Sequence, residues 1–132
     1  MERRFNIIRT SEDYHSPLRR RLCVDIETAK EIRDYLYSNN KKFLQIAERL
    51  LTLSNIYYDH YKQEYKQGKY IVSAIRFLDK QNVRIYCQEM SDSEGDFFII
   101  CSEIISKKVQ KNDKAINDIL ESISNYEYEY KP

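Results

Sequence analysis

The chain has 132 residues, enough for one domain, and 22 Lys and Arg against 21 Asp and Glu, a balance that excludes a general polycation. Its two glycines, Gly68 and Gly95, cannot form the glycine-rich motifs that bind dinucleotides or nucleoside triphosphates. Its three cysteines form no C-x-x-C pair and its longest apolar run, residues 97–101, is far too short to span a membrane, so we expect a cytoplasmic protein with no metal, no cofactor and no membrane partner.

The N-terminal part of the chain predicts a short strand and then an irregular basic segment. Residues 4–9 alternate, with Phe5 and Ile7 on one face, as in a half-buried strand. Residues 10–24 show no such period and include three consecutive arginines at 19–21. We expect these arginines to attract a polyanion without being positioned for chemistry.

Two helices are predicted next. The first begins at about Asp25, a residue type that caps helices, and ends at the polar residues 38–40. The second begins at about Lys41, and its apolar stripe predicts that it continues through Tyr61 and ends before Gly68.

A hairpin follows the helices. Residues 70–78 and 82–89 are rich in β-branched and aromatic residues, and three polar residues between them predict a turn. Aligning the apolar faces of the two strands places Arg76 directly opposite Arg84 on the other face.

Like charges that face each other across two strands are destabilising, so this pair needs an explanation. One interpretation is that an anion or a carboxylate lies between the two guanidinium groups. Phosphate fits this interpretation, because each guanidinium can donate two parallel hydrogen bonds to it. The other interpretation is that both side chains extend into water.

The C-terminal part predicts one more strand and a last helix. Residues 96–106 are apolar on both faces, which is typical of a central strand, and the last helix begins at about Asn112. The tail, residues 126–130, either folds back to supply a tyrosine or is a disordered end. The whole chain, residues 1–132, is thus predicted to be one α+β domain. Its small antiparallel sheet contains the N-terminal strand and a three-stranded C-terminal meander, packed by two N-terminal helices and one C-terminal helix.

Three stretches resemble the RelE/ParE superfamily of bacterial toxins, and most of all its HigB-like, phage-derived branch. They are SAIRFL, NVRIYC and IISKKVQKNDKAI. The order strand, two helices, three antiparallel strands and terminal helix also resembles the RelE-like fold. The resemblance extends from about Leu44 to Tyr126, and residues 10–40 look like a divergent or inserted segment.

The resemblance implies the toxin of a type II toxin–antitoxin system, a metal-independent mRNA endoribonuclease that acts with or without the ribosome and is neutralised by a cognate antitoxin. In such an enzyme a ribose 2′-hydroxyl attacks the adjacent phosphate, which needs cations around the phosphate and a group that accepts the 2′ proton. The matching positions assign catalysis to Arg84, Lys108 and Arg76, and binding of RNA to Lys107, Lys111 and Tyr86.

Some features leave this assignment open. Tyr86 either stacks on a base or packs inside the domain. The tyrosine or histidine that some members carry near the C terminus is not found at the matching place, which leaves a lysine of lowered pKa as the candidate base. Two other functions fit the same fold, a ParE-like inhibitor of gyrase and a catalytically silent module that binds another protein.

Overall fold

The computed structural model describes residues 2–67, 70–79, 81–106 and 113–129. The described residues form an α+β fold, as predicted, with three α-helices and one seven-stranded sheet. In chain order the elements are β1 (Glu2–Thr10), the 3₁₀ turn η1 (Ser11–Tyr14), β2 (Arg20–Asp25), α1 (Ala29–Ser38), α2 (Asn40–Thr52), β3 (Tyr61–Gln67), β4 (Tyr70–Phe77), β5 (Val83–Ser91), β6 (Phe97–Ser106), α3 (Asp113–Ser124) and β7 (Glu127–Glu129).

The sheet is larger than predicted, and it is mixed rather than antiparallel. Its strand order is β3-β4-β5-β6-β2-β1-β7, and β6 lies in the middle, as its apolar faces predicted. The pairs β2–β6 and β1–β7 are parallel, whereas the other pairs are antiparallel. The three additional strands are β2, β3 and β7, none of which the sequence pattern predicted.

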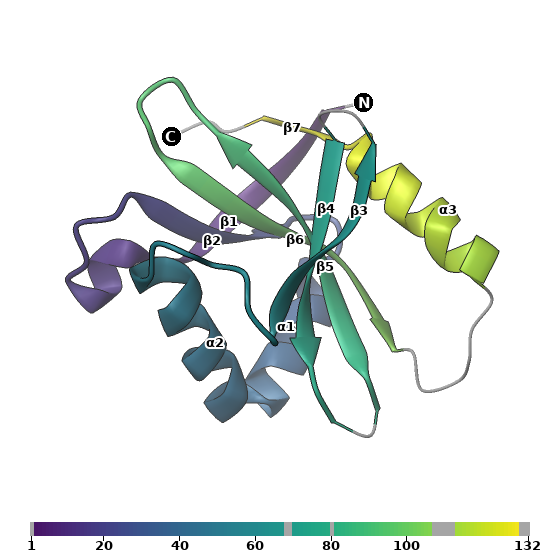
Figure 1. Ribbon diagram of the computed structural model, residues 1–132, viewed down its shortest axis with the longest axis horizontal. Coiled ribbons are helices and arrows are strands. Elements are labelled where there is room, and N and C mark those ends of the chain that lie inside the picture. Colours follow the sequence, from purple (N-terminus) through teal and green to yellow (C-terminus); the bar gives the residue numbers. More distant parts are fainter. Residues whose placement is uncertain (1, 68–69, 80, 107–112, 130–132) are drawn as a thin grey trace.

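Helices cover both faces of this sheet (Figure 1). On one face α1 and α2 bury the main core, in which Leu50 and Leu51 of α2 lie among Leu22, Ile85 and Ile99 of the strands. On the other face α3 packs against β4 and β5 through an apolar stripe that includes Leu120 and Ile123. The prediction that Phe5 and Ile7 share a face is confirmed, because both belong to one apolar cluster on this second face.

The second predicted helix is too long. The chain leaves the helical conformation at Leu53, and Tyr61, predicted to be helical, is the first residue of the edge strand β3. The reason is burial, because Tyr61 opposite Ile75 of β4 is completely buried in the main core. A continued helix would have carried this ring away from the sheet.

The segment predicted to be irregular contains β2, which is inserted between β1 and β6. Leu22, Cys23 and Val24 of this strand are completely buried, and Asp25, predicted to cap a helix, is its last residue. The first helix therefore begins later than predicted, at Ala29. Within the described part of the chain, no helix has the length and apolarity needed to cross a membrane.

Candidate functional site

The predicted facing of Arg76 and Arg84 is confirmed. Arg76 of β4 is directly opposite Arg84 of β5, and the flanking pairs Ile75–Ile85 and Phe77–Val83 point to the other face of the sheet. The two arginines therefore share the face that carries α3. The backbone of Arg76 is held from the side of β3, because its N–H donates to the carbonyl oxygen of His60 at 2.8 Å.

A carboxylate lies at this pair, which is one of the arrangements that the sequence left open. The guanidinium of Arg84 forms an ion pair with Glu64 of β3, and the two side chains are 13% and 22% exposed. Glu64 is the extra residue of a β-bulge, because the pairing with β4 shifts between Gln63 and Tyr65. Sequence reasoning missed Glu64 because it placed residues 61–67 in a helix.

The pair is only partly satisfied by this carboxylate. Within the described residues, the Nε atoms of Arg76 and Arg84 are buried and have no hydrogen-bond partner. Buried N–H groups without a partner cost free energy, so the site retains donors that an anion could satisfy. A phosphate group, which accepts several hydrogen bonds from guanidinium forks, matches these donors in charge and in geometry.

Tyr86 does not present its ring for stacking on a base. It is 1% exposed and packs in the apolar cluster that contains Leu120 and Ile123 of α3. Burial raises the pKa of its hydroxyl, an effect that the charge of Arg84 opposes. Of the two interpretations of Tyr86, packing is therefore the one that the geometry supports.

The predicted lysines Lys107, Lys108 and Lys111 lie outside the described residues. The strand before them ends close to the arginine pair, since Ile105 is the partner of Arg84 in the register of β5 and β6. Ser106, the last residue of β6, donates from its hydroxyl to the carbonyl oxygen of Gln81 in the β4–β5 turn at 3.0 Å.

The described part of the C-terminal tail, residues 126–129, folds back, but neither of its two tyrosines contacts the arginine pair. It forms β7, which runs parallel to β1 at the far edge of the sheet. The Tyr126 hydroxyl donates to Glu103 at 3.1 Å, and the Tyr128 hydroxyl donates to the buried Asp25 at 2.6 Å. Burial is the main cause of the raised pKa of both tyrosines. Neither tyrosine is thus a base for chemistry at Arg84.

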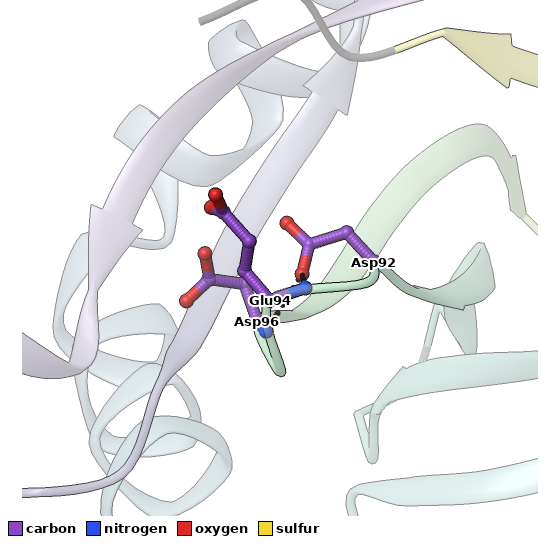
Figure 2. A group of neighbouring side chains, drawn as sticks. All are labelled: Asp92, Glu94 and Asp96. Atoms are coloured by element: carbon purple, nitrogen blue, oxygen red, sulfur yellow. Dashed lines mark hydrogen bonds between the residues drawn. The ribbon is translucent and has the colours of Figure 1, made fainter.

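Among the described residues, one group of acidic side chains is close enough to hold a cation, and it lies in the loop between β5 and β6 (Figure 2). It consists of Asp92, Glu94 and Asp96. Asp92 accepts hydrogen bonds at 2.9 Å from the backbone N–H groups of Glu94 and Asp96. Asp96 forms an ion pair with Arg19 at 3.0 Å. These contacts explain the cluster as the closure of a tight loop.

Comparison of the chain with models of protein families, with curated proteins and with solved structures finds no match. The arginine pair with its carboxylate is therefore interpreted from its own chemistry.

Proposed function

We propose that the chain is a toxin of the RelE/ParE type that cleaves RNA, and that Arg76 and Arg84 bind the phosphate at the cleaved bond. The elements β1, α1, α2, β4, β5, β6 and α3 follow one another in the order that the resemblance implies, with β2, β3 and β7 as additional strands, and this order supports the proposal. The observation that carries it is the Arg76–Arg84 pair, which has buried donors without partners and a carboxylate in contact.

The pair and its carboxylate provide two of the groups that the reaction needs. The 2′-hydroxyl oxygen attacks phosphorus, the bond from phosphorus to the 5′ oxygen breaks, and the 5′ oxygen leaves with a proton from solvent. Arg84 and Arg76 stabilise the negative charge that gathers on the phosphoryl oxygens. Glu64, in contact with Arg84, is the group that accepts the 2′ proton. Lys107, Lys108 and Lys111 remain proposals from the resemblance, as RNA-binding or charge-stabilising groups.

Toxicity tests this proposal. Expression of the wild-type chain in bacteria should inhibit growth, expression of Arg84→Ala or Arg76→Ala should inhibit it much less, and Lys30→Ala, a change at an exposed ion pair on α1, should inhibit it like the wild type.

Purified wild-type protein, with ribosomes where needed, should leave RNA ends that carry a 2′,3′-cyclic phosphate or a 3′-phosphate, at a rate that EDTA does not change. Products with 5′-phosphates would contradict the proposed reaction.

A catalytically silent module that binds another protein is the second candidate. The neutralisation of Arg84 by Glu64 and the burial of Tyr86 favour it, because both reduce what the site offers to RNA. In that case the folded wild-type chain cleaves no RNA with or without ribosomes, and Arg84→Ala keeps whatever effect on growth the wild type has.

A further inference from the structure

A second cluster of polar side chains lies on the face of the sheet opposite the arginine pair. The Glu89 carboxylate of β5 accepts hydrogen bonds from the hydroxyls of Tyr57, Tyr61 and Ser73, with shortest distances of 2.8, 2.6 and 3.1 Å. Burial raises the pKa of Tyr61, and burial together with the Glu89 contact raises the pKa of Tyr57 to about 12. Both hydroxyls thus stay protonated, and the cluster is a fixed set of donors around one acceptor.

This cluster fixes the ring of Tyr57 at the surface. The ring stacks on the completely buried ring of Tyr61, with the two planes at 5° and their centroids 5.6 Å apart. One face of Tyr57 is covered in this way, yet the residue is 39% exposed. A large aromatic ring that is held at its hydroxyl and along one face can stack on a ligand with little loss of side-chain entropy.

The exposed side of Tyr57 lines a surface depression of about 460 Å³, together with Tyr58, Asp59, Lys62 and Gln63. The Asp59 carboxylate can accept hydrogen bonds from the edge of a base, and the Gln63 amide can both accept and donate them. Two cationic side chains lie near these lining residues. Lys62 itself lines the depression, and the Arg49 guanidinium lies 4.0 Å from the centroid of the Tyr58 ring. Aromatic rings beside cations are the combination with which proteins hold single-stranded nucleic acid.

We propose that this depression is a subsite for a nucleobase, which stacks on Tyr57. His60, in the turn that contains the subsite, contacts the backbone of β4, because its Nδ1 lies 2.8 Å from the carbonyl oxygen of Arg76. The side chains of Arg76 and Arg84 lie on the opposite face of the sheet. The subsite does not depend on RNA cleavage, since base stacking requires neither the arginines nor a reaction.

Free nucleosides test the subsite in the intact protein. Adenosine and uridine should shift the NMR signals of the Tyr57 ring in a saturable way, whereas ribose and inorganic phosphate should not. Tyr57→Ala should weaken the binding about tenfold or more, since stacking on an aromatic side chain contributes that much per base. Tyr37→Ala removes a tyrosine that is 86% exposed on α1, and it should leave nucleoside affinity unchanged.

Three results would overturn the proposal: nucleosides that give no saturable shift, ribose that binds as well as nucleosides, and nucleoside binding that survives Tyr57→Ala. Should Tyr57→Ala fail to fold, nuclear Overhauser contacts between the base and the Tyr57 ring of the wild type decide, since their absence contradicts the subsite. Arg84→Ala should keep nucleoside affinity, because a nucleoside carries no phosphate. Loss of RNA cleavage in that variant thus tests the proposed function alone.

Discussion

Glu64 and an RNA phosphate compete for the same guanidinium in the proposed complex. The carboxylate neutralises Arg84 in the free protein, so binding of RNA must break or share this ion pair. Both side chains are largely buried, and a contact of this kind costs more to break than an ion pair at the surface. The same carboxylate is the proposed base, which means that its removal should affect binding and chemistry in opposite directions.

Glu64→Gln should therefore bind RNA more tightly than the wild type but cleave it more slowly. Loss of the negative charge frees Arg84 for phosphate, and the salt dependence of binding should become steeper by about one ion. Loss of the base should lower the cleavage rate at saturating RNA by about 10²- to 10⁴-fold. Filter binding over a range of salt and single-turnover cleavage measure the two effects separately.

Asp34→Asn is the matched control for this prediction, because it breaks an exposed carboxylate–lysine pair on α1. It should change neither quantity. Unchanged RNA affinity in Glu64→Gln would mean that Arg84 does not contact the phosphate. An unchanged cleavage rate would mean that another group accepts the 2′ proton.

At the scale of elements, the arginines of residues 19–21 contact other parts of the fold, because Arg19 and Arg21 form ion pairs with Asp96 and Arg20 contacts the end of α2. Arg20 donates from its guanidinium to the carbonyl oxygens of Leu50 and Ser54 at 3.0 and 2.9 Å, and also to that of Leu53. These carbonyls lie at and just after the end of α2, where helical hydrogen bonds run out. Arg20 therefore has a structural role at the end of α2 that the sequence did not predict, and the attraction of a polyanion by this segment stays a prediction.

Arg20→Ala should lower the free energy of unfolding by about 1–3 kcal/mol, since charged hydrogen bonds to the end of a helix are lost. Urea unfolding followed by circular dichroism measures this change. Arg33→Ala, at an exposed position of α1, is the control and should have a much smaller effect. If Arg20→Ala unfolds like the wild type but binds RNA more weakly, Arg20 serves binding rather than the stability of α2.

The elements that sequence reasoning predicted well are those with a clear period. Alternation in residues 70–89 gave the hairpin and the facing of Arg76 and Arg84, because an error of one residue would have turned every apolar side chain outward. The bulge at Glu64 breaks the alternation of β3, and most of the other described side chains of this edge strand are polar and exposed. Because β3 was not predicted, the Glu64 carboxylate could not be placed beside Arg84 from the sequence.

The sequence pattern did not predict β2, for a different reason. Its core residues 22–24 are buried on both faces, a pattern without alternation, and the arginines before them resemble a basic loop. Its parallel pairing with β6 joins segments more than 70 residues apart in the sequence. No local pattern encodes such a contact, so the size and mixed character of the sheet emerge only in three dimensions.

At the scale of the whole molecule, hydroxyl–carboxylate contacts connect strands that are distant in the sequence. Tyr128 of β7 donates to the buried Asp25 of β2, and Arg3 of β1 contacts the same carboxylate at 2.7 Å. Near the opposite edge, Tyr61 of β3 donates to Glu89 of β5. In both places the hydroxyl of a protonated tyrosine donates a hydrogen bond to a carboxylate. The stability of the sheet should therefore depend on the protonation of these tyrosines.

Alkaline pH should accordingly unfold the protein. Burial raises the pKa of Tyr61 and Tyr128 above the usual value of about 10, and the pKa of Tyr57 is about 12. Above about pH 10 the unfolded chain releases protons that the folded chain keeps, so the free energy of unfolding falls as the pH rises through this range and is unaffected by these groups below it. Urea unfolding at a series of pH values measures this slope.

Tyr61→Phe should be less stable at neutral pH but show a shallower decline above about pH 10, because one titrating group is gone. Tyr37→Phe, which removes an exposed hydroxyl outside both contacts, is the control, and an equal slope in Tyr61→Phe and in this control would contradict the role of the buried hydroxyl.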